Sequence, residues 1–379
     1  DSGECDQPTA PCQTIQYVVD QAQPGETVEV ATGSYTDFHV RPRNDVTTTG
    51  VVTQVLYISK TLNLEGRYTA TVWETQDPEA NPTVLDAQGQ GRVLYITGEI
   101  TPTVEGLTIT GGDAAGLGGH RFVGDGKGGI YFYESAARLQ QNIVVTNTAA
   151  AGGGVLLVHI DAVVSDNELR SNTATDFGGG LYALYSNASK LDNTIFSNSS
   201  LFGGGLCLNG GSNHVADNAV EGNSASEGAA FSLSFAGGSL QGNTILSNSA
   251  NRGGELRLNQ SDAMLVGNFV ADCEASLSGS GLYLWGSAPQ LLHNTFAQDG
   301  GGDGTMIVVD RHWGVDVWSD PAFSSDLIHC QAESILLSGQ SHMDERVLTW
   351  CLQTSSRIVR KESNAGDTGR HNSRAFWEP

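Results

Sequence analysis

The sequence lacks several features that would place it in a common class. Charged residues make up only 16% of the 379 residues, and proline occurs 10 times. No stretch approaches the roughly 20 consecutive apolar residues of a membrane-spanning helix, so we expect no membrane span. The chain opens at Asp1-Ser2-Gly3 without a signal peptide, as expected of a mature exported protein.

Basic residues are scarce. Lysine and arginine number 19 against 42 aspartates and glutamates, which gives a formal charge of −23. Nucleic acids and anionic membranes are bound largely through lysine and arginine, so neither is an expected partner. The charge also disfavours an anionic polysaccharide unless cations screen it. A neutral glycan, a cation or no ligand at all fits better.

The six cysteines show neither a C-x-x-C motif nor the spacing of a metal site. Cys5 and Cys12 flank a short loop and could form a disulfide, which suits an oxidising compartment. We therefore expect a secreted or cell-surface protein. The other four are isolated thiols or include one more pair: Cys207, Cys273, Cys330 and Cys351.

Glycine, by contrast, is abundant and regularly placed. The 48 glycines are close to double the usual share of about 7%, and many lie in small-residue triplets followed by an apolar strand. A period near 25 residues predicts a solenoid, a stack of similar coils. The triplets begin 25 or 26 residues apart, at Gly152, Gly178, Gly203, Gly228, Gly253 and Gly279.

Asparagine follows the same period at two places in each unit. Asparagine suits a corner because it tolerates the left-handed conformation and its amide can bond to the next coil. Apolar residues two positions after the first asparagine, and those directly after the triplets, form two columns expected to face inward, about 4.8 Å from coil to coil. The first asparagine recurs as Asn142, Asn167, Asn193, Asn218, Asn243, Asn268 and Asn294. The second recurs as Asn147, Asn172, Asn198, Asn223 and Asn248, and lapses at Cys273.

The two ends of the chain differ from the repeat. Residues 14–23 have helical apolar spacing and precede a strand at 27–30, so a short helix is expected to cap the first coil. Past about residue 318 the glycine and asparagine markers disappear. We therefore predict an N-terminal cap (1–25), a solenoid (26–318) and an atypical C-terminal cap or tail (319–379).

The segment TIQYVVDQAQPGETVEVATGSY, residues 14–35, resembles the first coil of pectin-lyase-like proteins. The units resemble the polymorphic outer-membrane-protein repeat, as in Gly204-Gly205-Leu206 and Phe196-Ser197-Asn198. This resemblance covers residues 12 to about 310. It implies an all-β, right-handed parallel β-helix of about 10–12 coils. It implies no single activity, because the superfamily includes lyases, hydrolases, epimerases and adhesins.

In such solenoids the functional groove usually follows the sheet after the triplet. One exception to the repeat lies there, because Glu255 replaces the small third residue of its triplet, and such breaks concentrate at functional sites. Glu227, one coil earlier, could pair with it at the roughly 6.5–9.5 Å of an inverting glycosidase. We therefore predict Glu255 and Glu227 as catalytic carboxylates. The residues predicted to bind substrate lie on outward positions nearby: Tyr182, Arg252, Arg257, Tyr283 and Trp285. The two outward columns are expected to continue from Tyr283 to Ile307 and from Trp285 to Val309.

Simpler interpretations of the same residues stay open. Glu227 and Arg252 could form a cross-coil ion pair, and Arg257 an ordinary cation–π contact with Tyr283. No metal or other cofactor is required by these predictions, although two acidic groups could take Ca²⁺. One is a glycine-rich loop that could instead cover the groove, with Asp113, His120, Arg121, Asp125 and Lys127. The other is an outward column of Asp166, Asp192 and Asp217.

Three functions follow from these observations. The preferred one, by analogy with secreted members of the superfamily, is a glycoside hydrolase that cleaves a neutral polysaccharide with a carboxylate pair. The alternative is a non-catalytic cell-surface adhesin or carbohydrate-binding solenoid, which the regular repeat and the small outward Ser232 and Ser234 favour. A polysaccharide lyase comes third, because the charge is unfavourable and no base is evident. The expected partner is a polysaccharide or cell-surface glycan, bound by a monomer.

Overall fold

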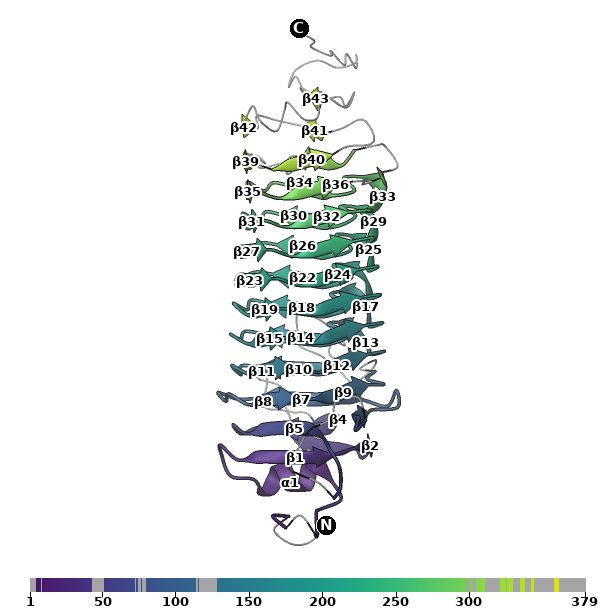
Figure 1. Ribbon diagram of the computed structural model, residues 1–379, viewed down its shortest axis with the longest axis vertical. Helices are drawn as coiled ribbons and strands as arrows, with labels where there is room; N and C mark the ends of the chain where they lie inside the picture. The colour runs from purple at the N-terminus through teal and green to yellow at the C-terminus, as the bar shows by residue number, and fades with distance from the viewer. Residues whose placement is uncertain are drawn as a thin grey trace.

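In the computed structural model, strands from successive coils pair side by side and form sheets that run along a tall stack (Figure 1). The architecture is the predicted all-β parallel β-helix with one helix near the N-terminus. The structure describes residues 5–7, 9–42, 51–71, 73, 76, 80–113, 115, 128–297, 300–301, 305–310, 321–324, 326–329, 335–337, 342–343 and 358–360.

Four sheets make up the stack, named A to D here, and most coils run in the order D, C, A, B. Sheet A contains β1 (Thr27–Ala31), β5 (Asn63–Tyr68), β8 (Thr103–Glu105), β11 (Arg138–Gln140), β15 (Val163–Ser165), β19 (Ser189–Leu191), β23 (Ser212–Ala216), β27 (Gly237–Gln241), β31 (Met264–Val266), β35 (Gln290–Leu292), β39 (Ala322–Ser324) and β42 (His342–Met343). Sheet B contains β2 (Gly33–Tyr35), β6 (Thr83–Asp86), β9 (Leu107–Thr110), β12 (Ile143–Val145), β16 (Glu168–Arg170), β20 (Thr194–Phe196), β24 (Ala219–Glu221), β28 (Thr244–Leu246), β32 (Phe269–Ala271), β36 (Thr295–Ala297) and β40 (Leu327–His329).

Sheet C follows the glycine triplets, and sheet D precedes them. Sheet C contains β3 (His39–Pro42), β4 (Val51–Ile58), β7 (Arg92–Thr97), β10 (Ile130–Tyr133), β14 (Val155–Val158), β18 (Leu181–Leu184), β22 (Leu206–Asn209), β26 (Phe231–Ser234), β30 (Leu256–Asn259), β34 (Leu282–Trp285), β38 (Ile307–Asp310), β41 (Ile335–Leu337) and β43 (Ile358–Arg360). Sheet D contains β13 (Thr148–Ala151), β17 (Thr173–Phe177), β21 (Ser199–Phe202), β25 (Ser224–Glu227), β29 (Ser249–Arg252), β33 (Glu274–Ser278) and β37 (Gly300–Gly301).

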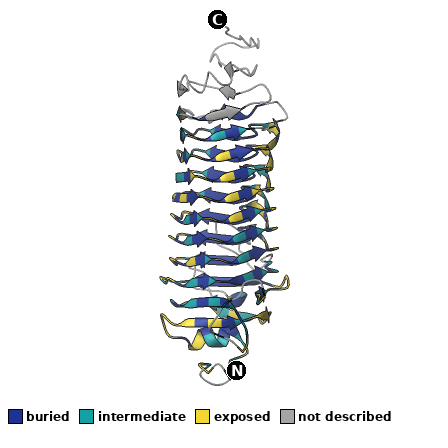
Figure 2. Cartoon of the chain, viewed as in Figure 1, coloured by how far each residue is buried: buried dark blue, intermediate teal, exposed yellow. Residues whose placement is uncertain are grey.

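The core fills the inside of the coils, as the two apolar columns predict. Val144, Leu169 and Ile195 stack in register in sheet B and are fully buried. In sheet C, Val155, Leu181 and Leu206 do the same. The burial pattern repeats from coil to coil (Figure 2). Each coil therefore covers the apolar face of its neighbour, which is the stabilising principle of a solenoid.

Both asparagine series form continuous hydrogen-bonded ladders inside the corners. The backbone N–H and the side-chain Nδ2 of Asn172, for example, donate to Oδ1 of Asn198 at 3.0 and 3.1 Å. Asn198 donates in the same way to Asn223 at 2.9 and 3.0 Å. Each asparagine thus depends on the next coil for its acceptor.

The left-handed residue of each corner is not the asparagine, which corrects our conformational argument for it. Positive φ angles fall on the residue before it, as in Asp166 (57°), Ser171 (54°) and Asp192 (55°). The asparagine is kept for its amide, which satisfies buried backbone groups that the corner would otherwise leave unpaired.

The first ladder ends on a carboxylate. Asn294, its last member, donates from its backbone N–H and its Nδ2 to Oδ1 of Asp326 at 2.7 and 2.9 Å. Burial raises the pKa of Asp326, while the hydrogen bonds from Asn294 and Ser324 oppose that rise. Each asparagine donates to the asparagine of the next coil, so the last one needs an acceptor from outside the series.

Helix α1 (Ile15–Gln21) covers the open N-terminal end of the stack, as predicted. Its Gln16 is buried and makes a reciprocal pair with the backbone of Tyr57, with distances of 3.0 and 2.8 Å. Nζ of Lys60 donates to the carbonyl oxygens of Asp20 and Ala22 at the end of the helix, where a cation is favourable.

The described strands after residue 318 extend the same ladders. Strand β39 pairs with β35, β40 with β36 and β41 with β38, all in parallel. These short strands continue sheets A, B and C beyond the last clear sequence repeat. The loss of the glycine and asparagine markers therefore does not end the strand pairing.

Candidate functional site

The outer face of sheet C carries most of the predicted site residues, in two columns. Register corrects the ends of both columns: Tyr283 pairs with Val308 rather than Ile307, and Trp285 pairs with Asp310 rather than Val309. Ile307 and Val309 point into the core. One outward column reads Tyr131, Leu156, Tyr182, Cys207, Ser232, Arg257, Tyr283 and Val308. The other reads Tyr133, Val158, Leu184, Asn209, Ser234, Asn259, Trp285 and Asp310.

The first half of this face is closed. Its outward side chains form a second apolar cluster, separate from the core inside the coils. Tyr182 is only 1% exposed; its ring stacks on Phe177 at 5.4 Å, and Phe177 stacks on Phe202 at 5.6 Å. Burial is the main cause that raises the pKa of Tyr182. The prediction that Tyr182 contacts a substrate is therefore wrong, because side chains from sheet D cover it.

The second half of the face is partly open. Trp285 and Tyr283 alternate on β34, and both are half-buried. Register places Asn259 one coil before Trp285 and Asp310 one coil after it. Ser234, half-buried, precedes Asn259 in the same column. Aromatic and hydrogen-bonding groups thus lie together on one accessible surface, which we call the β34 surface: Ser234, Asn259, Tyr283, Trp285 and Asp310.

A charged cluster borders this surface where sheet D meets sheet C. The Glu227 carboxylate lies 2.5 Å from Nε of Arg257 and 3.5 Å from Nη1 of Arg252. Arg257 is 5% exposed, and its guanidinium lies 5.2 Å from the ring centroid of Phe202. The predicted cross-coil pair of Glu227 and Arg252 is present, and the cation–π partner of Arg257 is Phe202. Such a buried cation needs a counter-charge, which Glu227 supplies.

Tyr283 links the charged cluster to the β34 surface. Its hydroxyl donates to Oδ2 of Asp310 at 3.3 Å. Burial raises the pKa of Tyr283 to about 12; the charge of Asp310 and that of Glu227 add to the rise, while Arg252 opposes it. Two carboxylates and a cation therefore act on one phenol.

Glu255 does not lie on this face. It is fully buried, and its carboxylate accepts from Asn248, at 3.1 Å from the backbone N–H and 2.6 Å from Nδ2. Asn248 is the last asparagine of the second ladder. A carboxylate inside a coil cannot touch a polysaccharide, so the predicted catalytic pair of Glu255 and Glu227 does not form.

The position of Glu255 explains both exceptions in the repeat. In the coils below, the third triplet residue faces the next ladder asparagine: a Cβ on Gly180 would lie 3.2 Å from Nδ2 of Asn198. At the equivalent place beside Glu255 the sequence has Cys273 instead of asparagine. The smaller thiol leaves room for a long side chain, whose carboxylate supplies the acceptor that the missing asparagine would have given. Glu255 is a ladder residue.

The other candidate sites gain less from the structure. Most of the loop 111–127, including His120, Arg121, Asp125 and Lys127, lies outside the described residues, as do Cys330 and Cys351. Within the described residues no three His, Cys, Asp or Glu side chains gather as a metal site, so Ca²⁺ stays a prediction. The disulfide between Cys5 and Cys12 is present, whereas Cys207 and Cys273 are buried and belong to no disulfide.

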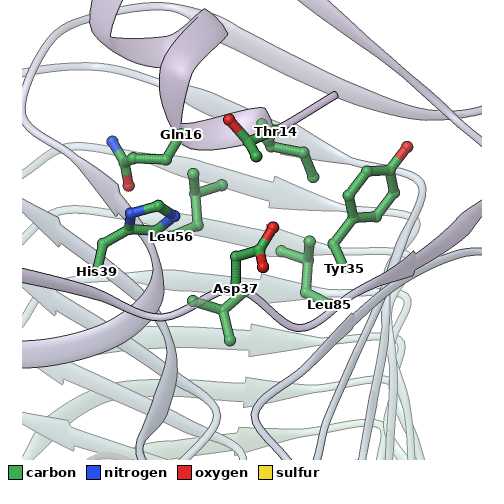
Figure 3. Close-up of a pocket in the computed structure, with 9 residues that line it drawn as sticks. Thr14, Gln16, Tyr35, Asp37, His39, Leu56 and Leu85 are labelled. Carbon is green, nitrogen blue, oxygen red and sulfur yellow. The ribbon is translucent and has the colours of Figure 1, made fainter. Parts of the chain in front are cut away.

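A small pocket beside helix α1, which the sequence did not suggest, contains Tyr35, Asp37 and His39 (Figure 3). Burial lowers the pKa of His39, with help from Arg41 and against the pull of Asp37. The cavity volume is about 10 Å³, room for about one water molecule and far below the roughly 300 Å³ of small ligand sites. It also lies at the capped end, far along the stack from the β34 surface.

Residues 94–270 match the family model described as right handed beta helix region. This match agrees with the parallel coils and with the predicted right-handed parallel β-helix. It does not distinguish the outer-membrane-protein type of repeat. No significant match was found among curated proteins or solved structures. In the part of the chain that is described, no helix is long and apolar enough to cross a membrane. The fold is compatible with carbohydrate-active and with adhesin-like proteins.

Proposed function

We propose that the protein is a carbohydrate-binding solenoid that holds a neutral glycan on the β34 surface. The observation that carries the proposal is the half-buried Trp285, which lies in register between the polar Asn259 and Asp310, with the half-buried Tyr283 two residues away on the same strand. Aromatic rings offer flat apolar area, and the flanking amide and carboxylate supply hydrogen bonds to hydroxyl groups. The charge of −23 favours an uncharged ligand.

Trp285→Ala is the direct test. We expect it to weaken binding to immobilised neutral polysaccharides by roughly 2 kcal/mol, about thirty-fold in Kd, because exposed aromatic anchors dominate such interfaces. Phe269→Ala is the matched control, since Phe269 is an exposed aromatic residue on sheet B. Equal affinities for wild type and both variants, measured by affinity electrophoresis or calorimetry on a glycan panel, would remove the β34 surface from the proposal.

A glycoside hydrolase is the second candidate, because Glu227 and Asp310 both act on Tyr283. Glu227 is paired with two arginines, whereas Asp310 lies on the β34 surface beside Trp285, so Asp310 is the carboxylate better placed to reach a substrate. This function predicts new reducing ends from a neutral polysaccharide, lost in Asp310→Asn and in Glu227→Gln. Binding without new reducing ends or unsaturated products supports the binding protein over both the hydrolase and the lyase.

A further inference from the structure

Lys190 and Asn213 meet inside the solenoid, away from every site described above. Lys190 is the inward residue of β19, in register with Val164 on one side and Val215 on the other. Both of those neighbours belong to the apolar core. Asn213 is an inward residue of the next strand, β23. The two side chains are 0% and 2% exposed.

The lysine amine is placed against the asparagine carboxamide. Nζ of Lys190 donates to Oδ1 of Asn213 and, at 3.2 Å, to the carbonyl oxygen of Ala188. A neutral amine has two N–H groups, which match these two acceptors and leave its lone pair unused. Within the described residues, Nδ2 of Asn213 has no hydrogen-bond partner.

We propose that Lys190 and Asn213 form an intramolecular isopeptide bond that joins neighbouring coils through β19 and β23. The Nζ lone pair attacks Cγ of Asn213, so an Nζ–Cγ bond forms and the Cγ–Nδ2 bond breaks. One Nζ proton moves to the departing nitrogen, which leaves as ammonia, and the other stays on the new amide. No oxidant, reductant or co-reactant is needed.

Two physical effects favour this step. Burial lowers the pKa of Lys190 from 10.5 to about 7, so a large share of the amine is neutral and nucleophilic at physiological pH. Fixed contact between the reacting groups replaces a bimolecular encounter, and such intramolecular reactions reach effective concentrations of roughly 10⁵–10⁸ M. The product also removes an amine whose burial is unfavourable.

Mass spectrometry of the full chain tests the bond. Under denaturing conditions we expect a mass below the sequence value by one ammonia, after allowance for the Cys5–Cys12 disulfide. Succinimide formation, for example at Asn209-Gly210, would give the same loss but is cleaved by hydroxylamine, whereas an isopeptide is resistant. Trypsin should therefore leave residues 171–252 as one hydroxylamine-resistant peptide, uncleaved after Lys190 and one ammonia lighter than its sequence, with Lys190 and Asn213 closing an internal loop.

Asn213→Ala should restore the sequence mass and tryptic cleavage after Lys190. Lys190→Met, which lacks that cleavage site, should show the mass of its own sequence. The methionine variant keeps an apolar core, so its far-UV circular dichroism checks that the fold is intact. Folded wild type at its sequence mass, cleaved by trypsin after Lys190, would overturn the proposal.

A second readout is the pH dependence of unfolding. A free amine has a lower pKa in the folded state than in the unfolded state. The wild-type unfolding constant would then fall about tenfold per pH unit between pH 7 and 10.5, relative to Lys190→Met. A linked lysine gives no such difference.

Discussion

Glu255→Gly is expected to destabilise the protein by about 3–5 kcal/mol, the usual cost of breaking a buried hydrogen-bonded charge interaction. The substitution restores the small residue of the repeat, so a view of Glu255 as a groove residue predicts little loss of stability. In the structure, however, both donors of Asn248 lose their carboxylate acceptor. Urea unfolding followed by circular dichroism measures the difference.

Cys273→Asn supplies the decisive comparison. Alone, it places an amide where the Glu255 carboxylate already lies, and we expect a loss of about 1–3 kcal/mol from overpacking. Combined with Glu255→Gly, it recreates the ladder of the lower coils, and the double variant should return to within about 1 kcal/mol of wild type. If the stability losses of the two single variants add in the double variant, positions 255 and 273 do not supply the same hydrogen-bond acceptor.

Asn198→Ala tests the ladder itself. We expect a loss of about 3–5 kcal/mol, because the backbone N–H and Nδ2 of Asn172 lose their acceptor, and the carbonyl of Leu169 loses its donor. The fall should appear as a lower midpoint in chemical denaturation, with faster amide hydrogen exchange in β17 and β21.

Asn251→Ala is the matched control for Asn198→Ala. Asn251 lies on the exposed side of sheet D and accepts one hydrogen bond, from Ser276. We expect a change within about 0.5 kcal/mol, as for surface substitutions in general. Similar losses for Asn198→Ala and Asn251→Ala would contradict the assignment of stability to the ladder.

The fold was predictable because two independent residue patterns, the glycine triplets and the asparagines, recur with the same period. The inward columns follow from that period, and their register is the one observed. The prediction of the last outward residues was wrong at residues 306–309. Four consecutive apolar residues there give no alternation that would identify the inward side. Strand pairing after residue 318 was also hidden, because it relies on backbone bonds that need no marker residue.

The site was harder to predict because burial depends on neighbours from other sheets. Tyr182 occupies an outward position, as expected, yet Phe177 and its neighbours cover it. Glu255 was correctly identified as an exception, but the direction of its side chain is decided by contacts between the triplet and the following asparagine. A usable signal was present: the triplet fails at Glu255 and the asparagine fails at Cys273, both within the same repeat.

The one-way hydrogen bonding of the corners limits how this molecule can be lengthened or shortened. Both asparagine series finish on an acid, Glu255 in one and Asp326 in the other. Each acid is the last hydrogen-bond acceptor of its series. A coil inserted before Glu255 must bring its own asparagine, whereas one inserted after it needs none at that corner. If the coil that carries one of these acids is deleted, the acid must be moved to the new last coil so that the last asparagine keeps an acceptor. Glu255 and Asp326 therefore limit where coils can be added or removed, and neither acid belongs to the repeating sequence pattern.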